Sequence, residues 1–239
     1  MLRIQFERDM RKIQDDLLVM GSMVEQAILG SVDALKKRDM EASQRIIDGD
    51  MRINEKRFEI ENACIVTVAT QQPMARDLRI LASVLEIISD LERMGDYAKG
   101  IGNISLKIGK EKPLKPLIDI PRMAQLSVNM LHRALTAFIE GDIVQSLKIP
   151  KEDDLVDELY NQVHRELVTY IIADPSVIDR ADCLLWTAHN LERMADRVTN
   201  ICERVIFVGT GELMEMNDIY ARMESDADFK DMLVNPKSS

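Results

Sequence analysis

Two copies of one short acidic segment hold the residues best suited to bind a cation. The first reads Leu-Glu-Arg-Met-Gly-Asp at residues 91–96 and the second Leu-Glu-Arg-Met-Ala-Asp at residues 191–196. Glu92 with Asp96, and Glu192 with Asp196, are four residues apart, which makes each pair neighbours on one helix face. Like charges at this spacing cost a helix roughly 0.2–0.5 kcal/mol. A counter-charge is therefore expected beside each pair.

A second pair of polar side chains precedes each segment. Asp50 with Asn54, and Asp153 with Asp157, are again four residues apart. If the helices that carry the two pairs pack side by side, four oxygen-bearing groups converge in each half. Oxygen ligands suit hard cations such as Mg²⁺, Mn²⁺ or iron. The spacing therefore predicts metal ligands at Glu92, Asp96, Asp153, Asp157, Glu192, Asp196, Asp50 and Asn54.

The same acids are also compatible with a solvated helix face or with ion pairs. Acid pairs at this spacing are common in a chain with 41 acidic residues, and most of them belong to a solvated face. Arg93 and Arg193, inside the two segments, can instead neutralise the acids or tie neighbouring helices together. Spacing alone does not separate a metal site from an ion-pair network.

Motifs of several enzyme classes are missing from the sequence. No Glu-x-x-His of the ferritin-like oxidases, His-Glu-x-x-His, P-loop or Gly-x-Ser-x-Gly is present. His189 lies three residues before Glu192, but Ser89 takes its place in the first half, so we expect a histidine of the helix surface. Trp186, the only tryptophan, is expected to be buried, and no aromatic cluster marks a docking face.

The apolar pattern indicates that long helices position all of these residues. It is most regular from Met74 to Ile108, where apolar residues recur every three or four positions and only Ser105 interrupts the stripe. The other expected helices cover residues 6–38, 40–71, 121–140, 142–173 and 177–208. We expect a turn or bend near Gly49, a disturbance at Pro150, and a short helix with a frayed tail over 212–239.

The repeated segments, and the matching order of helices and proline breaks, indicate an internal duplication. With only 10 Gly, 7 Pro and few aromatics, the chain lacks the punctuation and residue types of strands. We predict an all-α fold of two tandem pseudo-symmetric three-helix bundles, with six long helices. Residues 1–111 would form the first repeat, 112–116 a linker, 117–210 the second repeat, and 211–239 a C-terminal tail.

Composition narrows the class of protein. The net charge is −10, and no block of Lys and Arg is available to neutralise phosphates, which argues against a nucleic-acid partner. The three cysteines are far apart in apolar stretches and fit buried thiols in a reducing compartment. Because the N-terminus lacks a signal-peptide core and no run of ~18 apolar residues occurs, we expect a soluble cytoplasmic protein.

The two acidic segments resemble the Glu-Arg-x-Gly-Asp signature of the PhoU family, accessory proteins of bacterial phosphate-specific transport. Further matches lie at residues 20–26, 41–54, 72–79 and 152–157. The resemblance implies a negative regulator of phosphate uptake and of phosphate-starvation signalling. Its partners would be the ATPase of a phosphate ABC transporter and a sensor histidine kinase, with contact to the membrane only through them. A homodimer is the expected assembly.

The family resemblance also bears on the metal prediction. Some members bind metal clusters through acidic motifs that match the eight predicted ligands. Ala195 replaces the usual Gly of the signature, which should be harmless if the helix face there is not tightly crossed. Asn54 offers a neutral oxygen where Asp157 offers a charge, so the first site would hold metal more weakly.

Three functions follow as hypotheses. The leading one is a non-enzymatic signalling adaptor of phosphate transport. The second is a metal-dependent hydrolase or oxidase that uses the acidic clusters. The third is a purely structural helical adaptor whose acids only solvate a face.

Overall fold

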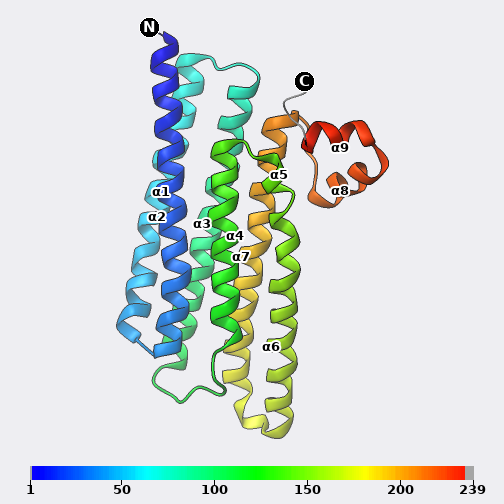
Figure 1. Cartoon of the computed structure of the whole chain (residues 1–239). Coiled ribbons are helices and arrows are strands. Elements are labelled where there is room, and N and C mark those ends of the chain that lie inside the picture. Colours follow the sequence, from blue (N-terminus) through cyan, green and yellow to red (C-terminus); the bar gives the residue numbers. More distant parts are fainter. Residues whose placement is uncertain (1, 235–239) are drawn as a thin grey trace.

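The computed structural model describes residues 2–234, and long helices running side by side make up most of this range, with no strand in it (Figure 1). This confirms the predicted all-α class. The long helices are α1 (Leu2–Lys37), α2 (Met40–Gln71), α3 (Arg76–Ile108), α4 (Asp119–Glu140), α6 (Asp153–Ala173) and α7 (Ile178–Thr210). The short elements are α5 (Ile143–Ser146), α8 (Met216–Ser225), α9 (Ala227–Val234) and the 3₁₀ turns η1 (Ile149–Glu152) and η2 (Pro175–Val177).

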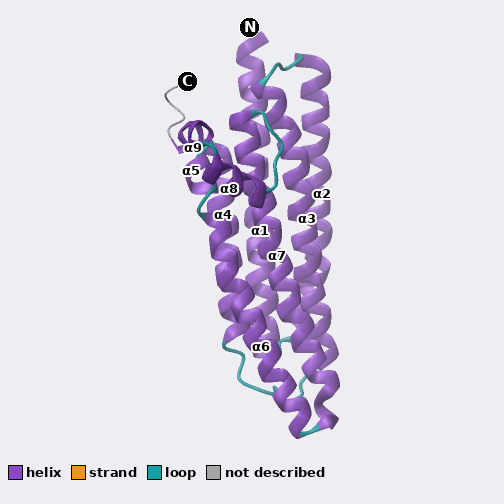
Figure 2. Ribbon diagram, turned by 90° about the vertical axis from the view of Figure 1, so that its right-hand side faces the viewer, coloured by secondary structure: helices purple, strands orange, loops and turns teal. Residues whose placement is uncertain are grey.

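The long helices form two groups of three. Helices α1, α2 and α3 pack on one another, as do α4, α6 and α7, and the groups meet where α3 contacts α7 and α1 contacts α4. Helices α2 and α6 lie at opposite edges of the bundle in Figure 1, and Figure 2 shows the same long axis from the side. Two three-helix bundles side by side are the predicted architecture. The exact division of the chain into repeats, linker and tail stays a prediction.

Helices α3 and α7 run antiparallel along the seam between the groups. Arg79 donates to the carbonyl of Val208 at 3.3 Å, and Arg197 donates to Asp90 Oδ1 at 3.3 Å. Rising numbers on α3 therefore meet falling numbers on α7. Continued along both helices, this register places residues 91–96 beside residues 191–196. The two copies of the acidic segment thus meet near the pseudo-two-fold axis.

The apolar stripe of α3 faces the core. Its residues from Val84 to Ile101 are fully buried: Val84, Ile87, Leu91, Met94, Ala98 and Ile101. Ser105, which interrupts the stripe in the sequence, is buried as well. Its hydroxyl lies 2.8 Å from that of Ser43 on α2 in a hydrogen bond. The interruption is therefore a satisfied polar contact inside the core.

For the second helix of each half, the expected bend at Gly49 was wrong, and the expected disturbance at Pro150 is confirmed but larger than predicted. Helix α2 continues through Gly49 without the expected bend, because no atom crowds that position and a single glycine costs a helix only about 1 kcal/mol. Conversely, the expected helix over 142–173 is not merely disturbed at Pro150 but divided into α5, η1 and α6. Proline lacks the N–H that would continue the helical ladder.

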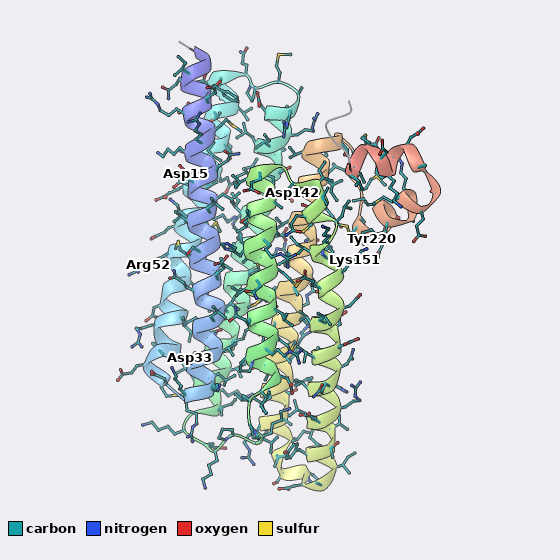
Figure 3. All side chains as sticks on the ribbon, in the orientation of Figure 1. Asp15, Asp33, Arg52, Asp142, Lys151 and Tyr220 are labelled. Carbon is teal, nitrogen blue, oxygen red and sulfur yellow. The ribbon has the colours of Figure 1, made fainter. Side chains whose placement is uncertain are left out.

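The C-terminal residues cover this division. They form two short helices, α8 and α9, rather than one. The hydroxyl of Tyr220 on α8 donates to the carbonyl of Leu147 at 2.9 Å, and Lys151 lies over the ring of Tyr220 (Figure 3). Ile219, Phe229 and Leu233 are buried. The end of the chain therefore satisfies part of the backbone that the break at Pro150 leaves open.

The core also holds the three thiols and the apolar side of the first helix. Cys64, Cys183 and Cys202 are buried free thiols, and burial raises the pKa of Cys64 to about 12. Within residues 2–234, the stretch Ile4–Lys37 is long and apolar enough, by length and composition alone, to cross a membrane. In this structure that helix packs against α2, α3 and α4, as the core helix of a soluble protein also would.

Candidate acidic sites of the two halves

The predicted ligands lie on neighbouring helices in both halves. The first set, which we call the first-half site, has Asp50 and Asn54 on α2 and Glu92 and Asp96 on α3. The second-half site has Asp153 and Asp157 on α6 and Glu192 and Asp196 on α7. Helix α2 packs on α3 and α6 packs on α7, as the metal prediction required.

In the first-half site a lysine neutralises the most buried acid. Asp50 is 4% exposed, and its Oδ2 accepts a hydrogen bond from Lys99 Nζ at 2.8 Å and another from the amide of Asn54 at 3.3 Å. Lys99 Nζ also lies 3.9 Å from Asp96 Oδ1. The hydrogen bond to Asp50 raises the pKa of Lys99 above its usual value, with smaller contributions from Asp96 and Glu92. A side-chain ammonium thus supplies the expected counter-charge.

Close packing brings Asp50 to α3. A Cβ placed on Gly95 would lie 3.1 Å from the side chain of Ile53 and 3.6 Å from Asp50 Oδ1. Gly95 therefore stands where α2 crosses α3 tightly. Ala195 takes this position in the second half, where it is fully buried.

The second-half site has no such lysine, since Thr199 stands where Lys99 stands in the first half. Burial, and then the charges of Asp157, Asp196 and Glu192, raise the pKa of Asp153 to about 7. Burial and then Asp196 also raise the pKa values of Asp157 and Glu192. The four carboxylates lie close enough to oppose one another's ionisation.

Two buried oxygens of the second-half site lack a hydrogen bond. They are Asp153 Oδ1 and Glu192 Oε2. His189 Nδ1 lies 3.2 Å from Glu192 Oε2, but without the alignment of a hydrogen bond. Arg193 reaches only Asp196, at 3.7 Å. The arginine compensation considered from the sequence is therefore partial.

As placed, these side chains do not yet form a coordination shell. Among residues 2–234, no three His, Cys, Asp or Glu side chains are gathered around a point that could hold one metal ion. A cation would have to draw the four carboxylates together. The metal prediction for all eight residues stays a prediction.

Trp186 corrects another expectation. It is 54% exposed rather than buried, and its ring meets that of His189 edge-on at 5.6 Å between centroids. Tyr160 on α6 lies 6.1 Å from the same histidine. Trp186, His189 and Glu192 follow one another at three-residue steps, on a face of α7 beside the core stripe. An aromatic patch therefore borders the second-half site.

Sequence reasoning overlooked Lys99. A signal for it was present, because Lys99 follows Asp96 by three residues and Glu92 by seven, which places it on the same helix face. It is also a position at which the two repeats carry different chemistry, an ammonium in one and a hydroxyl in the other.

The fold and the paired sites define a duplicated all-helical protein with one acidic site in each half. A family model described as the PhoU domain matches residues 17–105 and again residues 120–205, so the chain belongs to the PhoU family. Both acidic sites lie inside the matched ranges, whereas α8 and α9 lie outside them.

Relatives resemble the chain over most of its length. A phosphate-specific transport system accessory protein PhoU homolog of Aquifex aeolicus is 36% identical over 91% of this chain and 98% of its own. The phosphate-specific transport system accessory protein PhoU of Escherichia coli is 32% identical over 87% and 86%. The crystal structure of PhoU from Pseudomonas aeruginosa superposes with a TM-score of 0.81 at 31% identity, covering 87% of this chain and all of that one.

Proposed function

We propose that this chain is a negative regulator of phosphate uptake and of phosphate-starvation signalling. It would act without catalysis, in the cytoplasm, as an adaptor between the ATPase of a phosphate ABC transporter and a sensor histidine kinase. The observation that carries this proposal is the family match in both halves, with relatives named as accessory proteins of phosphate-specific transport. A homodimer is part of the proposal.

An exposed apolar stripe on α2 supports an adaptor role. Met51, Phe58 and Ile65 are each more than half exposed, and they recur every seven residues, close to two helical turns. They therefore share one face of a helix at the edge of the bundle (Figure 1). Aligned apolar side chains on a helix surface are typical of a docking face.

Deletion of the gene tests the regulatory role. With phosphate in excess, we expect a reporter of the phosphate-starvation response to be derepressed in the deletion strain and repressed again by the wild-type gene. Phe58→Asp should fold but fail to restore repression. Ile172→Asp, at an even more exposed apolar position on α6, is the control and should restore it. Normal repression in the deletion strain would overturn the proposal.

We further propose that acidic clusters of this chain hold a hard cation, with the strongest support in the second half. Burial, and then the charges of neighbouring carboxylates, raise the pKa values of Asp153, Asp157 and Glu192, and Asp153 Oδ1 and Glu192 Oε2 are buried without a hydrogen bond. Mg²⁺, Mn²⁺ or an iron ion would neutralise the repulsion, and the ligands would be Asp153, Asp157, Glu192 and Asp196. The ion would fix α6 against α7 beside the aromatic patch.

The tryptophan provides a direct test of this cation. Trp186 and Glu192 are six residues apart on α7, about 9 Å along the helix. We expect Mn²⁺ to quench the fluorescence of Trp186 in the wild type and to raise its melting temperature. Asp153→Asn should abolish both effects. Quenching and stabilisation that persist in Asp153→Asn would refute binding at this site.

A further inference from the structure

The two acidic sites share a motif but carry different charge. The first-half site combines the three carboxylates of Asp50, Glu92 and Asp96 with the ammonium of Lys99, for a formal charge of −2. The second-half site combines four carboxylates with the neutral Thr199 and with Arg193, which lies 3.7 Å from Asp196, for a formal charge of −3. A cation is therefore attracted more strongly to the second site.

Lys99 also occupies one of the two oxygens that Asp50 could offer a metal ion, while Oδ1 of the same carboxylate is buried without a hydrogen bond. Among the residues of the first-half site Asp50 is the most deeply buried, and its Oδ2 already accepts hydrogen bonds from Lys99 at 2.8 Å and from Asn54 at 3.3 Å. A metal ion would have to displace an ammonium that also lies 3.9 Å from Asp96. It would then share a desolvated site with that positive charge.

The second-half site offers no such competitor. Thr199 carries no charge, and Asp157 replaces the amide donor Asn54 with another carboxylate. Asp153 Oδ1 and Glu192 Oε2 are buried without a hydrogen-bond donor. The equivalent surroundings thus lack both of the donors that bond Asp50 Oδ2.

We infer that Lys99 is the resident cation of the first half, so that this chain binds metal in its second half only. The inference rests on the proposed cation binding and differs from the untested prediction that both halves bind metal. The first-half residues hold α2 on α3 through an ion pair, and the second-half residues form the metal-dependent site. The two halves thus differ: Lys99 neutralises the acidic site of the first half, whereas the acidic site of the second half depends on a bound cation.

Metal stoichiometry tests the inference. Purified full-length protein is stripped with EDTA and titrated with Mn²⁺ in a calorimeter. We expect binding at the second half alone, abolished by Asp153→Asn and unchanged by Asp50→Asn. A variant with Lys99→Thr and Asn54→Asp copies the second-half chemistry and should bind at both halves. Lys99→Arg, which keeps the charge, should bind as the wild type does.

If Asp50→Asn and Asp153→Asn each halved the number of Mn²⁺ ions that the protein binds, the inference would be overturned. A variant with Lys99→Thr and Asn54→Asp that gains no binding, although its melting temperature shows that it is folded, would overturn it too.

A double-mutant cycle tests Lys99 without metal. Urea unfolding in EDTA is measured for Lys99→Met, Asp50→Asn and the two together. If Lys99 neutralises Asp50, the effects are not additive, with a coupling of about tenfold or more in the unfolding equilibrium constant. The matched pair Thr199→Met and Asp153→Asn should show no such coupling.

The cycle separates the two proposals. If no variant binds Mn²⁺, the proposed cation binding fails, but non-additivity still identifies Lys99 as the counter-ion of Asp50. Additive losses at Lys99 and Asp50 would overturn the role of Lys99 whatever the metal titration gives.

Discussion

Replacement of Asp153 by asparagine should stabilise the metal-free protein at pH 8. The ordinary pKa of this carboxyl is 3.8, and burial together with its acidic neighbours raises the pKa to about 7 in the folded protein. Above pH 7 Asp153 is ionised in both the folded and the unfolded state, and only the folded state carries the cost of the crowded charge. An asparagine at this position would keep the shape of the side chain without this charge.

The magnitude follows from the displaced pKa. A rise of about three units corresponds to roughly 4 kcal/mol at 1.36 kcal/mol per unit. Because Asp153 is only half-buried, solvent and salt screen its neighbours, and we expect about 1–2 kcal/mol instead. For a chain of this length, that gain raises the melting temperature by about 3–6 °C.

The size of the effect changes with pH in a defined way. Above pH 7 the raised pKa of Asp153 lowers the stability of the folded protein by its full amount. This loss shrinks as the pH falls from 7 towards 4. Below pH 4 it vanishes, because Asp153 is protonated in both the folded and the unfolded state. Melting temperatures of wild type and Asp153→Asn, measured in EDTA between pH 8 and pH 5, should therefore converge towards acidic pH.

The equivalent change in the first half is the control. Asp50→Asn removes the partner of Lys99 and should lower stability at pH 8. A destabilising Asp153→Asn at pH 8, or a gain that does not depend on pH, would refute the argument that the four carboxylates repel one another.

Three other changes test the packing. Arg197→Ala should lower the free energy of unfolding in urea by about 2–3 kcal/mol, because it leaves the carboxylate of Asp90 at the α3–α7 seam without its cation; an unchanged urea midpoint would contradict this. Tyr220→Phe should cost about 1 kcal/mol and speed amide exchange in α8, since the carbonyl of Leu147 loses its donor. Exchange that stays at the wild-type rate would show that this hydrogen bond does not hold α8. Gly49→Ala should raise the free energy of unfolding by about 0.5–1 kcal/mol, and with it the melting temperature, because the Cβ of the alanine would meet open space. Gly102→Ala should not raise the melting temperature, because the Cβ of this alanine would lie 3.2 Å from the carbonyl oxygen of Ser43. A loss of stability in Gly49→Ala would favour the bend expected from the sequence.

Apolar periodicity was sufficient to predict the long helices. The stripe on α3 is buried as predicted because each residue of that face contacts a neighbouring helix. The effect of Gly49 and Pro150 was harder to foresee. A glycine permits a bend in a helix but does not impose one. At Pro150 the missing N–H predicts a break, but not the hydrogen bond from Tyr220, about 70 residues later in the chain, to the carbonyl of Leu147.

Helical spacing also identified which acids share a face, but not what neutralises them. Whether a lysine reaches Asp50 depends on the packing of α2 against α3, and on a long flexible side chain that spacing does not direct. The exposure of Trp186 likewise depends on how α6 packs on α7. Pairs on one helix were therefore predictable, and pairs between helices were not.

The antiparallel seam of α3 and α7 sets an order for assembly during synthesis. Helices α1 to α3 are complete when residue 108 has been made, and all their mutual contacts are available to them. Asp90, in contrast, meets Arg197 and Asn200 only after more than 100 further residues have left the ribosome. Domains emerging first generally fold first. The face of α3 that binds α7 therefore stays without its partner until α7 has been made, and only then can this seam join the two halves of the duplicated chain into one body.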